Sequence, residues 1–123
     1  MSKVLVVEDN EFNSIVLKDM LEIIFPGIEV DVHDSALLSL EIGGHEAYDL
    51  ILSDIDMPGM SGMEFFTHLR EVLNVTMPII AVTALAVTGD KEKILMHGFE
   101  AYISKPIDFD ELGKVVAPFL ASS

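Results

Sequence analysis

Five side chains that can take part in chemistry each follow a short apolar run in this sequence. In chain order they are Glu8, Asp9, Asp54, Thr83 and Lys105. The runs before them are rich in Val, Ile and Leu, which favours short buried strands. If these runs are parallel strands of one sheet, their carboxyl ends share the edge where open sheets bind ligands. The sequence therefore predicts a site with three carboxylates, a hydroxyl and an ammonium group.

The three carboxylates cannot lie together as bare anions without a large electrostatic cost. Two like charges ~5 Å apart repel by about 3 kcal/mol at an effective dielectric constant of ~20. A shared proton or a bound cation must relieve that repulsion. The available ligands are all oxygens, which suit Mg²⁺, with Mn²⁺ as an alternative. We therefore expect Glu8, Asp9 and Asp54 to bind a metal that leaves positions open for a phosphate.

The predicted roles of the remaining groups follow from a phosphate ligand. A carboxylate beside a divalent cation can attack phosphorus and form an aspartyl phosphate, and Asp54 ends the most central of the acidic strands. Lys105 supplies a mobile positive charge for one phosphoryl oxygen. Thr83 supplies a hydroxyl donor for another.

The elements that must position these residues alternate regularly between strand and helix patterns. We expect strands at 3–7, 28–32, 49–53, 78–82 and 101–104, and helices at 11–25, 35–42, 62–73, 90–97 and from 109 onward. Strands that alternate with helices predict an α/β fold with a parallel sheet covered on both faces. The common order for such a doubly wound, flavodoxin-like sheet of five strands is 2-1-3-4-5. This order places the carboxylates at the point where the strand order reverses.

Two of the predicted helices contain residues that disfavour helical structure. The β-branched Val87 and Thr88 and the poor helix former Gly89 predict that the fourth helix is secure only from about Asp90. The segment from Val87 to Asp90 is expected to be mobile. Pro118 removes a backbone donor and clashes one turn back, so it is expected to kink the last helix or end it early.

Composition narrows the class of protein. The chain has 123 residues, which fits one domain over 1–123, and it contains no cysteine. Its net charge is −14, and its seven Lys and Arg are scattered, so we expect no direct nucleic-acid binding. No apolar run reaches the ~20 residues of a membrane span, and we expect a cytoplasmic protein. The four histidines show no ligand spacing and are expected at the surface.

Several segments together resemble the response-regulator receiver domains of two-component signalling, closest to single-domain receivers and the receivers of hybrid kinases. The segments are Val6 to Asn10, Asp54 to Gly62, Val82 to Ala84 and Ala101 to Pro106. They cover the chain in the order and spacing of that family.

The resemblance implies a role for each matching residue. It implies that Asp54 is phosphorylated, that Glu8 and Asp9 are the acidic metal-binding pair, and that Asp56 gives a backbone carbonyl to the metal.

The same resemblance implies a readout. Thr83 and Lys105 correspond to the pair that senses the phosphoryl group, and Tyr102 corresponds to the aromatic residue that switches inward. The bond between Lys105 and Pro106 is usually cis in the family.

The implied function is a phosphoacceptor and not an enzyme, since it catalyses only its own phosphotransfer and dephosphorylation. The implied donor is a histidine kinase or a histidine phosphotransfer protein. The implied output is a protein that binds the face made by the fourth helix, the fifth strand and the fifth helix.

Three alternatives can be set beside this function, although the order of the motifs speaks against the first and the full set of site residues against the last. Asp54 and Asp56 after an apolar strand also resemble the nucleophile motif of haloacid-dehalogenase-type phosphatases, although there the acidic pair follows the lysine. The chain could be a receiver excised from a hybrid histidine kinase. It could also be a binding module that works without phosphorylation.

Overall fold

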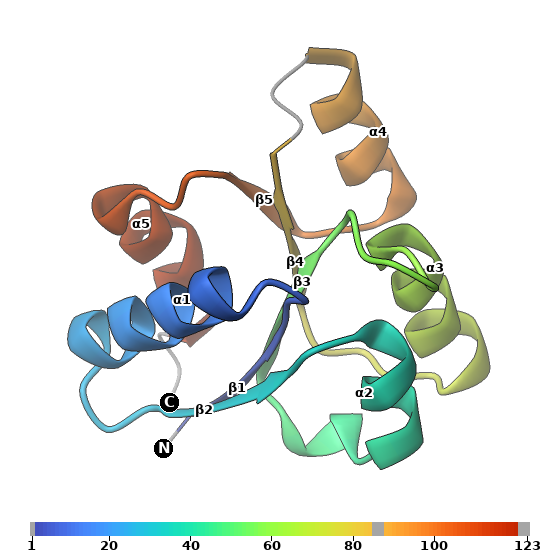
Figure 1. The fold of residues 1–123 in the computed structure, drawn as a ribbon, viewed down its shortest axis with the longest axis horizontal. Coiled ribbons are helices and arrows are strands. Elements are labelled where there is room, and N and C mark those ends of the chain that lie inside the picture. The colour runs from blue at the N-terminus through green and yellow to red at the C-terminus, as the bar shows by residue number, and fades with distance from the viewer. Residues whose placement is uncertain (1, 85–87, 121–123) are drawn as a thin grey trace.

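The computed structural model describes residues 2–84 and 88–120, without the side chains of 88 and 89. Its centre is a five-stranded parallel sheet in the order β2-β1-β3-β4-β5, as predicted (Figure 1). The strands are β1 (Lys3–Val7), β2 (Glu29–His33), β3 (Leu50–Asp54), β4 (Ile79–Thr83) and β5 (Ala101–Ser104). Each predicted strand lies within one residue of its observed bounds.

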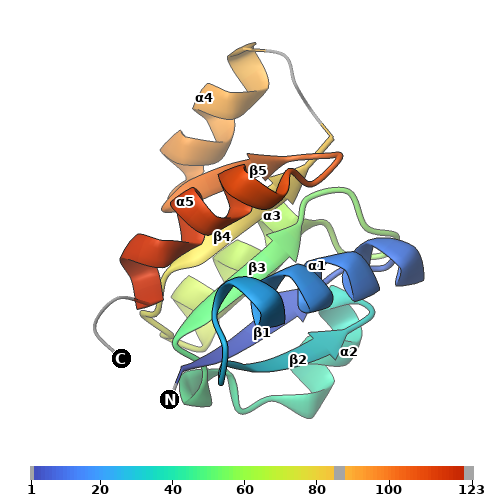
Figure 2. The ribbon, with the colours of Figure 1, turned by 90° about the vertical axis from the view of Figure 1, so that its left-hand side faces the viewer.

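Helices cover both faces of the sheet, so the fold is doubly wound (Figures 1 and 2). The α-helices are α1 (Glu11–Ile24), α2 (Ala36–Ile42), α3 (Gly62–Thr67), α4 (Thr88–His97) and α5 (Phe109–Leu120). Helices α1 and α5 lie on one face, and α2, α3 and α4 lie on the other. The predicted third helix, 62–73, consists of α3 followed by a π-helical turn, η2 (His68–Val72), whose π form was not predicted. A 3-10 turn, η1 (His45–Ala47), was not predicted at all.

The core has two layers because the central strands are buried on both faces. One layer packs β1, β3 and β4 against Leu17 and Leu21 of α1 and Leu112 of α5. The other packs the opposite sides of these strands against Phe65 of α3 and Ile94 of α4. Continuous apolar runs are expected for strands covered on both sides, and the edge strand β2 instead has exposed polar residues.

Polar side chains cap the helices at their amino ends and account for where they begin. Asn10 caps α1, Ser35 caps α2, and Ser61 forms a reciprocal capping box with Glu64 at α3. The carboxylate of Asp108 accepts from the backbone N–H of Glu111 at 2.8 Å and caps α5. Each such cap contributes about 1 kcal/mol.

The structure differs from the expectation at two helices. Helix α4 already begins at Thr88, because the propensity penalties there are below about 1 kcal/mol each and Ile94 anchors the helix in the core. Val87 lies outside the described residues. Helix α5 continues past Pro118 to Leu120, whose burial contributes about 1.5–3 kcal/mol and offsets the ~3 kcal/mol cost of proline.

The expectation of surface histidines is wrong for His33 and His45, which are 7% and 1% exposed. The hydroxyl of Ser39 lies 2.8 Å from His33 Nδ1 and 2.8 Å from His45 Nε2. Burial lowers the pKa of both histidines. A buried polar group needs a partner, and the shared serine supplies it for both rings.

Among the described residues, no helix is both long enough and apolar enough to cross a membrane.

Candidate functional site

The carboxyl ends of the central strands bring three acidic residues together. In the sheet register Val7 of β1 lies beside Ser53 of β3, so the residues that follow them, Glu8 and Asp54, are neighbours. One carboxylate oxygen from each of Glu8, Asp9 and Asp54 lies within 4.8 Å of the others. Glu8 and Asp54 are almost fully buried, at 1% and 3% exposed, whereas Asp9 is exposed. The predicted cluster is therefore present at the predicted edge.

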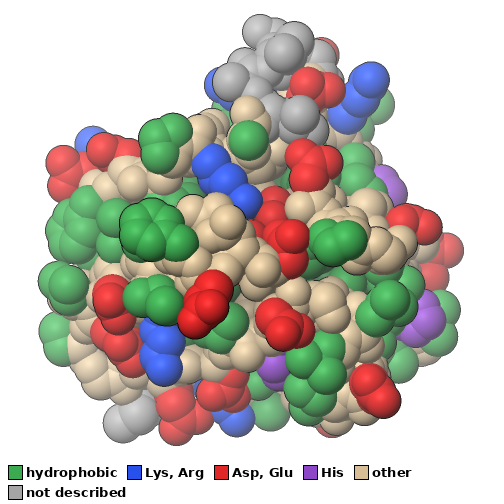
Figure 3. Space-filling view, viewed as in Figure 1, with side chains coloured by type: hydrophobic (Ala, Val, Ile, Leu, Met, Phe, Trp, Pro, Cys, Tyr) green, Lys and Arg blue, Asp and Glu red, His purple; other side chains and the backbone are tan. Residues whose placement is uncertain are grey.

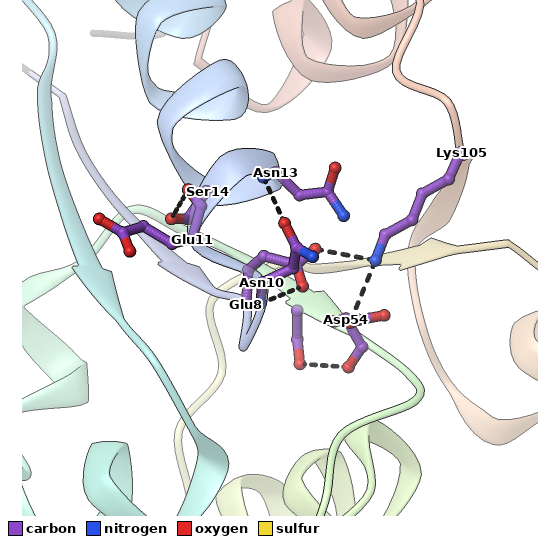
Figure 4. A network of polar contacts seen from close by, with 8 residues as sticks. Glu8, Asn10, Glu11, Asn13, Ser14, Asp54 and Lys105 are labelled. Carbon is purple, nitrogen blue, oxygen red and sulfur yellow. Dashed lines mark hydrogen bonds and ion pairs between the residues drawn. The ribbon is translucent and has the colours of Figure 1, made fainter.

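Lys105 lies among these carboxylates (Figure 4). Its Nζ atom is 2.9 Å from Glu8 Oε1 and 3.1 Å from Asp54 Oδ2. Its backbone N–H donates to the carbonyl of Thr83 at 2.8 Å, and its bond to Pro106 is cis. From the sequence, this ammonium is expected to be free for a phosphate. In the structure it already neutralises part of the acidic cluster, because an unpaired buried carboxylate is costly.

The pKa values of this cluster reflect burial and mutual charge. Burial raises the pKa of Asp54 to about 7, aided by the hydrogen bond and the charge of Glu8 and opposed by Lys105. Burial lowers the pKa of Lys105, but its hydrogen bonds with Glu8 and Asp54 and their charges outweigh that effect and raise it. Near neutral pH, the Asp54 carboxyl is therefore partly protonated unless a further cation binds beside it.

The first loop holds Glu8 through backbone groups. The N–H of Asn10 donates to Glu8 Oε2 at 3.1 Å, while the Asn10 side chain accepts from the N–H of Asn13 and caps α1 (Figure 4). The backbone N–H of Glu8 donates to the carbonyl of His33 at 3.1 Å. The orientation of this carboxylate is therefore tied to the first turn of α1 and to the end of β2.

The peptide of Asp54 is held by two residues whose positioning role the sequence reasoning missed. The Ser53 hydroxyl donates to the Asp54 carbonyl at 3.0 Å. Gly62, at the start of α3, approaches so closely that a Cβ there would lie 2.1 Å from the same carbonyl oxygen. Its N–H also donates to the carbonyl of Ile55 at 2.8 Å. The only signal in the sequence is a glycine directly after the Ser61 cap.

The donor set fits a hard divalent cation. Three carboxylate oxygens converge, and no cysteine exists in the chain. Among the described residues, the buried Glu8 Oε1 has the Lys105 ion pair but no hydrogen bond of good geometry. An oxygen in that state has a lone pair left with which to accept a cation. Mg²⁺ binds few protein carboxylates and keeps water on its other positions, which matches a half-open cluster.

The other predicted residues lie at or near this edge. Asp56 is exposed in the loop that follows β3. Thr83 ends β4 and is fully buried. Tyr102 lies on the edge strand β5, half-buried, with Lys91 Nζ 5.4 Å from its ring centre. Tyr102 and Lys91 line a cleft between α4, β5 and α5, together with Leu95 and Glu111.

Comparison with known proteins agrees with this geometry. The model of the response regulator receiver domain matches residues 4–117. A curated relative, the polar-differentiation response regulator DivK of Brucella ovis, is 38% identical over 121 residues, which cover 98% of this chain and 97% of the relative.

Two solved structures share the fold. One is the receiver domain of the sensor histidine kinase PA1611 from Pseudomonas aeruginosa, with a magnesium ion in its active site cleft. It is 29% identical with a TM-score of 0.81 and 98% coverage of both chains. The other is the receiver domain of Ssk1 from Saccharomyces cerevisiae, crystallised with the histidine phosphotransfer protein Ypd1. It is 26% identical with a TM-score of 0.84 and coverage of 96% of this chain and 88% of that one.

These matches confirm the resemblance found in the sequence and do not favour the phosphatase alternative. Receiver domains of this type are phosphoacceptors in signalling and not enzymes in the usual sense. The order of the strands, the acidic edge and the match over almost the whole length lead to one conclusion: this chain belongs to the response regulator receiver domain family.

Proposed function

We propose that Asp54 accepts a phosphoryl group from a histidine kinase or a histidine phosphotransfer protein, and that the modification changes which proteins this chain binds. The observation that supports Asp54 best is its place beside the Glu8 carboxylate, with the Lys105 ammonium 3.1 Å from Asp54 Oδ2. Burial and the neighbouring Glu8 raise the pKa of Asp54 to about 7. Perturbed titration in a cluster of charges is typical of reactive groups.

The transfer step requires Asp54 in its ionised form. One of its carboxylate oxygens forms a P–O bond as the P–N bond of the donor phosphohistidine breaks, and the histidine nitrogen leaves with the electron pair. A raised pKa opposes this step, because near neutral pH the carboxyl is partly protonated. The chain must therefore bring in positive charge before it reacts.

We assign the carboxylates of Glu8, Asp9 and Asp54 and the backbone carbonyl of Asp56 as the residues that would hold Mg²⁺. When bound, Mg²⁺ supplies the positive charge that ionises the cluster and offsets the negative charge of the incoming phosphoryl group. Mn²⁺ suits the same oxygen donors.

Lys105 and Thr83 read the result. Phosphorylation adds roughly −1.5 to −2 of charge, by analogy with other phosphorylated side chains. The Lys105 ammonium is drawn from Glu8 towards a phosphoryl oxygen, and Thr83 donates its hydroxyl to another. Because Lys105 and Thr83 share a backbone hydrogen bond of 2.8 Å, their movement displaces the ends of β4 and β5 together.

The change reaches the surface through Tyr102. This residue follows Ala101 on β5 and lines the cleft between α4, β5 and α5, so displacement of β5 alters the shape of that cleft. We propose this face as the contact surface for a downstream protein. The complex of the related Ssk1 receiver with Ypd1 supports a phosphotransfer protein as the donor.

The test is phosphorylation of the purified chain with acetyl phosphate and Mg²⁺, followed by intact-mass measurement. We expect one added phosphoryl group on the wild type and none on Asp54→Asn. The matched control is Asp56→Asn, which keeps its backbone carbonyl and is expected to accept the group. Equal labelling of the wild type and Asp54→Asn would disprove the assignment, as would labelling that is unchanged when Mg²⁺ is chelated.

A further inference from the structure

One long stretch of the chain carries acidic residues without a single basic one. Residues 19–69 contain no Lys or Arg. The acidic residues of this stretch are Asp19, Glu22, Glu29, Asp31, Asp34, Glu41, Glu46, Asp49, Asp54, Asp56 and Glu64. The stretch runs from the middle of α1 to the end of α3, and it includes all of β2 and α2. Lys and Arg are therefore absent from one continuous stretch that makes up more than a third of the sequence.

Helix α2 lies in this stretch and exposes large apolar side chains. Leu37, Leu38 and Ile42 are 54%, 37% and 58% exposed, whereas the inward face of the helix carries the buried Ala36 and Ser39 and the partly buried Leu40. A helix on the surface of a domain normally has a polar outer face. Three large aliphatic side chains on a helix of seven residues reverse that pattern, and such patches mark contact sites. We call Leu37, Leu38 and Ile42 the α2 patch.

The α2 patch extends towards the loop after β3. The Cδ1 atom of Leu37 lies only 3.1 Å from where a Cβ of Gly59 would be, so this side chain packs on the loop. Gly59 has a φ of 85°, which a side chain would strain, and the absence of a Cβ lets the two segments approach. The apolar surface is therefore continuous from α2 to the loop.

Acidic side chains border the α2 patch. Asp34 precedes the helix, Glu41 lies on it, and Glu46 follows it in η1, and all three are exposed. Figure 3 shows apolar side chains over α2 flanked by acidic ones. Among the described residues from β2 to η1, the ion pairs are those of Glu29 and Asp31 with Lys3, at 3.7 and 3.9 Å, and none involves Asp34, Glu41 or Glu46. Within the described part of the chain, no Lys or Arg forms an ion pair with the acidic border of the patch.

We propose that the α2 patch docks a basic amphipathic helix of another protein. The apolar face of such a helix would cover Leu37, Leu38 and Ile42, and its flanking Lys and Arg would meet Asp34, Glu41 and Glu46. Charge decides between possible occupants. A second copy of this chain would bring a further net charge of −14 to an acidic border, and nucleic acids and anionic membranes are repelled for the same reason.

The test uses a synthetic amphipathic helix of leucine and lysine as the probe, titrated into the unphosphorylated, isotopically labelled chain. We expect amide signals of α2 and of the loop around Gly59 to shift. Truncating an apolar anchor of an interface costs about tenfold or more in affinity, so Leu37→Ser with Ile42→Ser is expected to weaken binding by at least that factor. The matched control is Ile23→Ser, which removes an equally exposed aliphatic side chain, 66% exposed, from α1 in the same acidic stretch.

A second variant separates charge from apolar contact. Glu41→Lys keeps the α2 patch and reverses one border charge, and we expect weaker binding and a smaller dependence on salt. Three results would overturn the proposal. They are shifts centred on the face of α4 and β5, equal affinity for the double variant and the Ile23→Ser control, and self-association that the double variant abolishes. Thermal unfolding of each variant establishes that it is folded before binding is measured.

Discussion

In the absence of metal, Asp54→Asn is expected to be more stable than the wild type, by a margin that grows as the pH rises. The native pKa of Asp54 is about 7, above its ordinary value of 3.8, so the native state keeps a proton that the unfolded chain has already lost between these values. Stability from that proton is fully present below about pH 4 and is lost as the pH rises through about 7. The Asn variant cannot ionise at this position, so it does not lose stability in this way as the pH rises.

The size of the effect follows from the two pKa values. A shift of about three units corresponds to about 4 kcal/mol in total at alkaline pH, because each unit is worth about 1.4 kcal/mol. Between about pH 5 and about pH 8, we expect the stability advantage of the variant over the wild type to grow by about 2–3 kcal/mol. For a domain of this size that growth corresponds to a difference in Tm of about 10 °C.

The assay is urea denaturation of both proteins with chelator present, repeated across this pH range. Asp19→Asn, at an exposed position of α1 outside the acidic cluster, is the control for removal of a carboxylate. Mg²⁺ binds only the native cluster, so it is expected to stabilise the wild type and narrow the gap to the variant. A gap that does not change with pH, or a wild type more stable than the variant at about pH 8, would refute the reasoning.

Three further substitutions test contacts that hold the site or the surrounding fold in place. Gly62→Ala puts a Cβ 2.1 Å from the Asp54 carbonyl oxygen, so we expect strong destabilisation or loss of the acidic site, measured by thermal unfolding and Mg²⁺ binding. Gly113→Ala, inside α5 where a Cβ would make only an ordinary contact with Ile24 at 3.5 Å, is its control and is expected to stabilise by about 0.5–1 kcal/mol. Ser39→Ala leaves two buried imidazoles without their shared partner, and we expect a loss of about 1–3 kcal/mol in urea denaturation. Asp108→Ala removes the cap of α5 and is expected to cost about 1 kcal/mol in the same measurement.

Each of these expectations has a clear opposite outcome. Gly62→Ala with wild-type stability and metal affinity would show that α3 can move away from β3 at no cost. A Ser39→Ala protein as stable as the wild type would show that water replaces the hydroxyl. A neutral Asp108→Ala would mean that α5 is anchored by its buried residues alone.

Local patterns in the sequence were enough to locate nearly every element. Apolar runs with a polar stop predicted four of the strands within one residue, because strands covered on both faces have no exposed side to vary. The edge strand β2 was predicted, also within one residue, from its alternation of apolar and polar residues. The capping box of Ser61 and Glu64 gave the start of α3. The errors came where a distant contact outweighs a local preference. Leu120 is buried in the core and keeps α5 helical past Pro118.

The residues of the candidate site were predicted from the sequence, but the ion pairs among them were not. Glu8, Asp9 and Asp54 follow strands whose order is a common one, so their proximity could be expected. The ion pairs of Lys105 could not, because they depend on how a long side chain crosses from β5 to β1 and β3. His33 and His45 carried no periodic signal, and their link through Ser39 exists only when β2, α2 and η1 pack together.

The sequence by itself determined the alternation of strands and helices, the acidic residues at the strand ends and the membership of a signalling family. These properties depend on residue type and spacing, which act along the chain. Only the tertiary structure decided that Lys105 already compensates Glu8 and Asp54, that Gly62 presses on the Asp54 peptide, and that α2 presents Leu37 and Ile42 to solvent. These depend on distances between segments far apart in sequence, and a few ångströms decide whether charges attract or side chains are covered.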